Sequence, residues 1–195
     1  PVLWRNYFTQ LIKLGVSSNC EIVTTSKYSK NGLKNIFYNK KITHIYQSSE
    51  RVYFKNTTDT SKDFILHIGT FEKRKDLLTL VKAFKLFKEN TKSNLKLVLA
   101  GSKNFNGNKQ IYKEIKRYIL KNNLVSSIIM PGYINKKQAI YYFNNAFTYV
   151  FPSIDEGFGI PLIEAMRAQI PVICSDIEIF KEIADDSVIY FKKQY

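Results

Sequence analysis

The chain has 195 residues, 45% of them hydrophobic, and a formal net charge of +14. This length holds one ordinary domain and part of another, and the hydrophobic fraction excludes an intrinsically disordered chain. We expect neither a membrane-spanning segment nor a secretion signal, because no apolar run is long enough and the first residues lack the charged-then-apolar pattern.

Two isolated cysteines, Cys20 and Cys174, have neither metal-ligand nor redox spacing. They favour a reducing compartment, so we expect a cytoplasmic protein. The positive charge favours nucleic acid, an anionic membrane surface or a phosphate-bearing substrate, or it reflects lysines scattered over solvated faces. The lysines are scattered, as at Lys82, Lys85 and Lys88, and no nucleic-acid-binding motif occurs. We therefore expect no nucleic-acid partner, and we retain peripheral contact with an anionic membrane.

Residues 1–47 are too few to bury an independent core. They predict a helix at 4–14, a short strand at 21–25, a serine-capped helix at 26–38 and a strand at 41–47. The polar stretch 48–63 is typical of an interdomain linker.

From residue 64 onward, short apolar segments alternate with amphipathic ones. Strands are predicted at 64–69, 95–101, 127–134, 147–153, 171–176 and 187–191. Helices are predicted at 77–90, 109–122, 136–145, 161–168 and 177–183. This alternation predicts the α/β class, with a doubly wound parallel sheet covered on both faces. Ligands of such sheets bind at the carboxyl ends of the strands.

The segment 151–174, FPSIDEGFGIPLIEAMRAQIPVIC, carries the main functional signal. Gly157 and Gly159 allow the backbone to approach a ligand closely, and Pro161 suits the first position of a helix. The amides at that helix start are able to hold a phosphate. Glu156 precedes the turn, and Glu164 is expected within the first helical turn. A phosphate cradle between two carboxylates indicates a sugar-nucleotide site.

Arg74 and Lys75 follow the first strand of the sheet and are placed to offset the charge of a departing diphosphate. Paired carboxylates also occur in glycoside hydrolases, but a glutamate at a helix start beside a phosphate cradle should stay ionised, which suits hydroxyl binding better than proton donation. The turn GTFEKRK has a single glycine and no G-x-G-x-x-G, which disfavours a dinucleotide-dependent oxidoreductase. His67 lies in an apolar strand and is predicted to be a packed core residue.

Three blocks resemble the retaining family 4 glycosyltransferases of the GT-B fold. They are EGFGIPLIEAMRAQIPV, in which seven residues separate Glu156 from Glu164, the block 67–84, HIGTFEKRKDLLTLVKAF, and the block 130–153. The resemblance covers residues 65–191, and more faintly 22–46. It implies that 1–47 is the end of an N-terminal acceptor domain, 48–63 a linker, and 64–195 a Rossmann-like donor-binding domain. It also implies that the chain is truncated at both ends.

The resemblance further implies roles for individual residues. Glu156 would reach hydroxyls of the transferred sugar and Glu164 those of the ribose, while Arg74 and Lys75 contact the diphosphate. The remaining donor-binding residues implied are Gly157, Phe158, Gly159 and Ile160 of the turn, Gly69 and Thr70, Gly101 and Ser102, and Tyr133 and Ile134 beside the base. Several relatives have an arginine where Thr70 stands, although a threonine still donates a hydrogen bond.

We therefore expect a retaining hexosyltransferase that uses a nucleotide-diphosphate sugar, such as GDP-mannose or UDP-glucose, without a metal cofactor. Its acceptor would be a glycan or a lipid-linked glycan. The fragment alone is expected to bind the donor without full activity. The alternative from another class is a non-catalytic basic module that binds anionic membrane or nucleic acid.

Overall fold

The computed structural model describes residues 7, 10–12, 14–16, 20–49, 62–103 and 109–192. The chain forms two compact units, Pro1–Gln47 and Ser48–Tyr195. Of the predicted helix 4–14, the described residues 7, 10–12 and 14 are helical, and the others lie outside the described residues. Among the described helices, none combines the length and the apolar character needed to cross a membrane.

The first unit contains a small parallel pair of strands, β1 (Ile22–Thr24) and β2 (Ile42–His44), with helix α2 (Lys27–Lys34) between them. Ser26 caps α2 as predicted, because its Oγ accepts a hydrogen bond from the Ser29 amide at 3.0 Å. The helix ends four residues earlier than position 38, in a segment rich in asparagine and glycine, both poor helix formers.

The second unit confirms the predicted parallel sheet. Six parallel strands run in the order β5-β4-β3-β6-β7-β8. They are β3 (Phe64–Ile68), β4 (Lys96–Ala100), β5 (Ile128–Gly132), β6 (Thr148–Phe151), β7 (Val172–Ser175) and β8 (Ile189–Phe191). The helices are η2 (Lys73–Lys75, a 3₁₀ turn), α3 (Leu77–Thr91), α4 (Gln110–Lys121), α5 (Lys136–Asn145), α6 (Ile160–Arg167) and α7 (Glu178–Ala184). The 3₁₀ turn was not predicted.

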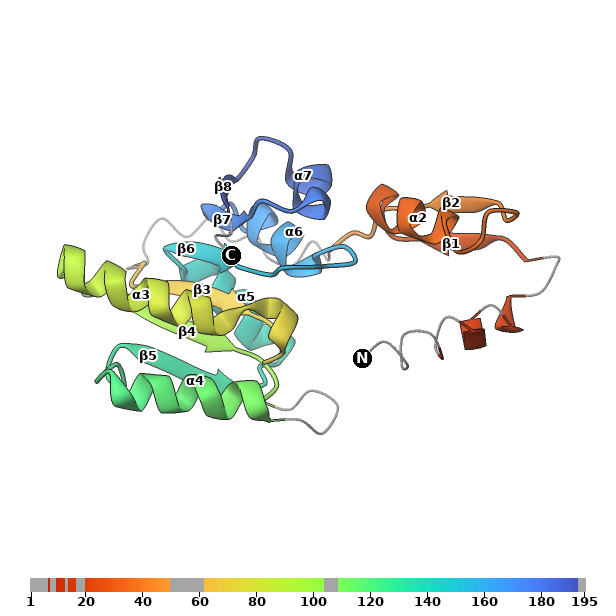
Figure 1. The fold of residues 1–195 in the computed structure, drawn as a ribbon. Coiled ribbons are helices and arrows are strands. Elements are labelled where there is room, and N and C mark those ends of the chain that lie inside the picture. Colours follow the sequence, from red (N-terminus) through yellow and green to blue (C-terminus); the bar gives the residue numbers. More distant parts are fainter. Residues whose placement is uncertain are drawn as a thin grey trace. The chain divides into compact units, whose positions relative to one another are not determined.

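Helices cover both faces of this sheet (Figure 1). One apolar layer joins α3 and α4 to the sheet through residues such as Leu80, Leu97 and Ile115. The other joins α5, α6 and α7 through residues such as Phe143, Leu162 and Phe180. Because both layers are buried, the strands are apolar on both faces, as the sequence indicated.

The strand order fixes where a ligand is expected. The chain leaves β3 toward β4 on one side, and it leaves β6 toward β7 on the other, although β3 and β6 are neighbours. The carboxyl ends of these two strands therefore flank the topological switch point, where doubly wound sheets bind nucleotides.

The start of the predicted linker lies against α6. Arg167, the last residue of α6, donates hydrogen bonds to the Ser49 carbonyl and, at 3.2 Å, to the Ser49 Oγ. Ser49 is buried. Residues 50–61 of the predicted linker lie outside the described residues.

Candidate functional site

The loops that follow β3, β4 and β6 are joined by backbone hydrogen bonds at one edge of the sheet. The Phe71 amide donates to the Ser102 carbonyl at 3.0 Å, and the Ile154 amide donates to the Arg74 carbonyl at 2.8 Å. The predicted cationic residues and the glutamate-bearing loop therefore meet at the switch point.

A cluster of four charged side chains lies at this edge. Lys75 Nζ is 2.6 Å from Glu156 Oε1, and Arg74 Nη1 is 2.5 Å from Glu156 Oε2. The other side of the guanidinium, Nη2, is 2.8 Å from Glu72 Oε1. Glu72, Lys75 and Glu156 are each 7% exposed, whereas the Arg74 side chain is 41% exposed. The cluster contains two acids and two bases, so its formal charge is balanced.

These contacts set the protonation states. Burial alone would raise the pKa of Glu156, but attraction and hydrogen bonding from Lys75 outweigh it and hold the pKa below its usual range. Burial would lower the pKa of Arg74, yet contact with Glu156 and Glu72 raises it. Glu156 is therefore ionised at neutral pH, and it acts as an acceptor of hydrogen bonds.

The 3₁₀ turn η2 brings Lys75 into this buried position. The Lys75 amide donates to the Glu72 carbonyl at 3.1 Å, and Asp76 then adopts a left-handed backbone with φ of 49°. Lys75 Nζ lies 4.9 Å from the centre of the Phe151 ring, at the end of β6. A cation over an aromatic face gains a favourable contact that offsets part of its desolvation.

The position of Glu164 differs from the prediction. Helix α6 begins at Ile160, so Pro161 is its second residue and Glu164 lies in the second turn rather than the first. The helix starts one residue early because Gly159, with φ of 104°, serves as its cap. Burial raises the pKa of Tyr149, and the charges of Glu164 and Glu156 add to that effect. Both glutamates thus act on the same buried hydroxyl.

Three of the four predicted donor-binding glycines leave little room for a Cβ, and one does not. A Cβ on Gly69 would lie 2.8 Å from the Nε2 of buried His67. A Cβ on Gly101, where φ is 150°, would lie 1.9 Å from the Gly69 carbonyl oxygen. A Cβ on Gly159 would lie 3.1 Å from the Phe180 ring. A Cβ on Gly157 would meet nothing within 4 Å, so this exposed position leaves open space in the loop between Glu156 and α6.

The remaining predicted donor-binding residues differ in what they present. Thr70 and Ser102 are half-buried at the carboxyl edge, and Tyr133 is 81% exposed. Phe158 and Ile134 are buried, and Ile134 belongs to the core beneath α5. Only the backbone of these two residues is therefore suited to contact a ligand.

His67 is a core residue, as predicted. It is fully buried, and its Nδ1 donates a hydrogen bond to the Val150 carbonyl at 2.9 Å. Burial lowers its pKa to about 4, so the ring is neutral at physiological pH. Within the described part of the chain, its Nε2 has no hydrogen-bond partner.

Glu72 is the member of the cluster that the sequence analysis missed. It stands two residues before Arg74, outside the segment with two glutamates, and nothing in its spacing marks it as buried. The one available signal was an acid followed by three bases in EKRK, a pattern that is common on solvated turns.

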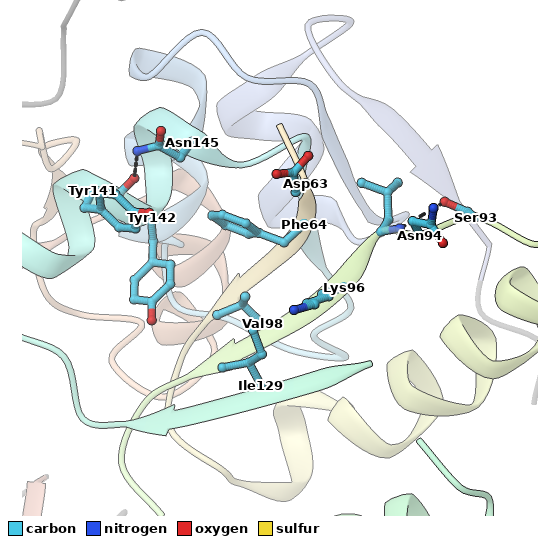
Figure 2. A pocket seen from close by; sticks show the side chains of 11 residues that line it. Asp63, Phe64, Ser93, Asn94, Lys96, Val98, Ile129, Tyr141, Tyr142 and Asn145 are labelled. Carbon is cyan, nitrogen blue, oxygen red and sulfur yellow. Dashed lines mark hydrogen bonds between the residues drawn. The ribbon is translucent and has the colours of Figure 1, made fainter. Parts of the chain in front are cut away.

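Two of the pockets formed by described residues of the second unit differ in their relation to this cluster. One, of about 990 Å³, is lined at the amino ends of β3 and β4 by residues such as Phe64 and Lys96, with Tyr142 of α5 (Figure 2). It lies at the opposite edge of the sheet and contains no predicted site residue. The other, of about 680 Å³, is lined by Glu72 and Arg74 and by the start of α4.

The fold is a doubly wound α/β domain with a charged cluster at its topological switch point. Residues 48–194 match the family model described as glycosyl transferases group 1, so the chain belongs to that family. It is 31% identical to O-antigen chain mannosyltransferase B of Escherichia coli over 64% of this chain and 31% of that protein. It is 26% identical to O-antigen chain mannosyltransferase RfbU of Salmonella typhimurium over 94% of this chain and 50% of that protein.

Among solved structures, sucrose-phosphate synthase from Thermosynechococcus elongatus has the same fold. The TM-score is 0.75 at 22% identity, over 89% of this chain and 45% of that one. The chain therefore spans half or less of the length of these relatives.

Proposed function

We propose that this chain is the donor-binding half of a retaining glycosyltransferase that transfers a hexose from a nucleotide-diphosphate sugar to a glycan or lipid-linked acceptor. The observation that carries the proposal is the convergence of Arg74, Lys75 and Glu156 at the carboxyl ends of β3 and β6. Similarity to two mannosyltransferases favours a GDP-mannose donor over UDP-glucose.

In this proposal the two cations stabilise the leaving group. The bond between the anomeric carbon and the pyrophosphate oxygen breaks, and Arg74 and Lys75 offset the negative charge that grows on that oxygen. The acceptor oxygen bonds to the same carbon and passes its proton to the departing phosphate. Glu156 accepts hydrogen bonds from hydroxyls of the transferred sugar, and Glu164 accepts them from the ribose.

Under this proposal, donor binding needs no metal ion, because Arg74 and Lys75 supply the positive charge. Two cationic groups at the pyrophosphate perform the charge compensation that a divalent ion supplies in other transferases. Binding of UDP or GDP should therefore be unchanged by a chelator. A loss of affinity in the chelator, restored by magnesium, would contradict this part of the proposal.

Titration calorimetry tests donor binding directly. The chain should bind UDP or GDP, or the sugar nucleotides, and Lys75→Ala or Glu164→Ala should weaken binding at least about tenfold. Lys82→Ala, which changes an exposed lysine of α3, is the matched control. Absence of wild-type binding at millimolar ligand would refute the proposal.

We also propose that the protein contacts the cytoplasmic membrane surface through α3 and α4. These helices carry seven basic and two acidic residues, whereas α5, α6 and α7 together carry four basic and three acidic ones. Lys116 and Lys121 of α4 are exposed. Positive charge near an anionic lipid surface favours binding that weakens with salt.

Sedimentation with phosphatidylglycerol vesicles tests this contact. The double variant Lys116→Glu with Lys121→Glu should lose binding, whereas Lys136→Glu with Lys137→Glu on α5, an equal change of charge at exposed positions, should retain it. An equal loss in both would show that net charge acts without a defined surface. Equal binding to phosphatidylcholine vesicles would also contradict the proposal.

A further inference from the structure

Glu72 has no part in the chemistry proposed above. It nevertheless contacts both residues of the same loop that do, Arg74 and Lys75. Its carboxylate is 2.8 Å from Arg74 Nη2, and its carbonyl accepts the Lys75 amide at 3.1 Å. Its own amide donates to the Thr70 carbonyl at 2.9 Å. A buried carboxylate with these contacts is a fixed part of the turn rather than a solvated charge.

Arg74 has two carboxylate partners among the described residues, and they are not equivalent. Glu156 also binds Lys75, and the proposed function turns Glu156 toward sugar hydroxyls when the donor binds. Glu72 lies on the other side of the guanidinium and has no such second task. When Glu156 turns to the sugar, Glu72 is the carboxylate that remains to orient Arg74.

The guanidinium has donors left for a ligand in this arrangement. Nη1 donates to Glu156 and, at 3.2 Å, to the Asp155 carbonyl, while Nη2 contacts Glu72. These contacts use three of the five N–H donors of an arginine. A phosphate is bound best by a guanidinium whose plane is already fixed, because less side-chain freedom is lost on binding.

We propose that Glu72 is a positioning residue for the pyrophosphate. It fixes the Arg74 guanidinium at the mouth of the site while Glu156 releases Arg74 and Lys75 and binds hydroxyls of the nucleotide sugar. This inference rests on the proposed function. The charge of Glu72 itself repels a phosphate, so its benefit comes from geometry. The effects of side-chain length and of charge at position 72 can therefore be separated by substituting Glu72.

The test measures the affinity for GDP-mannose and UDP-glucose by calorimetry in Glu72→Asp and Glu72→Gln, because only the complete donor offers hydroxyls to Glu156. Aspartate keeps the charge but is one methylene short, so affinity should fall about fivefold to tenfold. Glutamine keeps the reach and removes the repulsion, so affinity should stay within about threefold of the wild type or rise. In an Arg74→Ala background, Glu72→Asp should cause no additional loss. Uridine and guanosine binding should be unchanged in all variants.

The outcomes distinguish a failure of the inference about Glu72 from a failure of the proposed function on which it rests. Absence of wild-type binding overturns the proposed function and this inference together. Wild-type binding with unchanged affinity in Glu72→Asp, or with an equal loss in the Arg74→Ala background, overturns the inference alone. Glu178→Asp, at an exposed glutamate of α7, is the matched control.

An NMR measurement on the wild type tests the same inference without relying on a variant that has to fold. The signal of the Arg74 Nη–H groups in NMR spectra should remain resolved and slow to exchange both with and without GDP-mannose or UDP-glucose, because Nη1 and Nη2 carry the contacts to the carboxylates. Loss of that signal on binding would show that the guanidinium is not held, and it would overturn the inference.

Discussion

Acidification should destabilise the folded chain through His67. The pKa of this buried imidazole is lowered from 6.5 to about 4, first by burial and further by the charge of Lys75, against the opposing effects of the Val150 hydrogen bond and Glu156. Between these two values the unfolded chain binds a proton that the folded chain does not, so stability falls as the pH falls. The shift implies a loss of about 2 kcal/mol between about pH 7.5 and pH 5.

The assay is urea unfolding followed by circular dichroism at the two pH values, for the wild type and for His67→Asn. Asparagine does not titrate in this range, and its amide is able to keep donating to the Val150 carbonyl. The wild type should lose about 2 kcal/mol more than the variant on acidification. The charges of Lys75 and Glu156 are present in both proteins, so their own titration cancels in the difference.

His44 is the other histidine of the chain and supplies the control. It is half-buried in the first unit, and His44→Asn is the matched exchange of histidine for asparagine outside the second unit. If the wild type and His67→Asn lose stability in parallel, the imidazole is protonated in the folded chain and the argument from burial is wrong.

Two further predictions concern positions with contrasting surroundings. Gly101→Ala should destabilise by at least about 2 kcal/mol, because its Cβ would overlap the Gly69 carbonyl at a φ of 150°, whereas Gly157→Ala should change stability by less than about 0.5 kcal/mol. Thermal unfolding compares them, and similar melting temperatures would contradict the geometry. Burial and Asp176 raise the pKa of the Cys174 thiol to about 12, so a thiol reagent near pH 8 should modify half-buried Cys20 and spare Cys174 until the chain is unfolded. Mass spectrometry counts the modified thiols, and two rapid modifications would refute this expectation.

The sheet was predictable from the sequence because its strands are buried on both faces. Segments such as 95–101 and 147–153 are almost wholly apolar, and the stripe of α3 repeats at helical spacing. The boundaries were less predictable. Residues such as Gly69 and Pro152 extend the apolar pattern beyond the last strand residue, although the backbone has already turned there.

The site was only partly predictable for a different reason. Placing Arg74 and Glu156 on one edge needs only the rule that ligands bind at the carboxyl ends of parallel strands. Pairing them requires β6 to lie beside β3, and strand order is set by the packing of the whole sheet. The 3₁₀ turn at 73–75 has no apolar periodicity, and it depends on burial of Lys75 against Phe151 and Glu156.

The balanced charge of the cluster explains how the proposed pyrophosphate site can remain folded without a ligand. Lys75 buried alone would carry a large desolvation cost, and pairing with Glu156 offsets part of that cost. Under the proposed function, a pyrophosphate therefore exchanges one set of charge pairs for another rather than filling an unpaired site. The released Glu156 carboxylate then needs donors of its own, which a bare nucleoside diphosphate lacks at that position and the hydroxyls of a nucleotide sugar supply. The same ion pairs that stabilise the free fold would in this way favour the complete donor over its product.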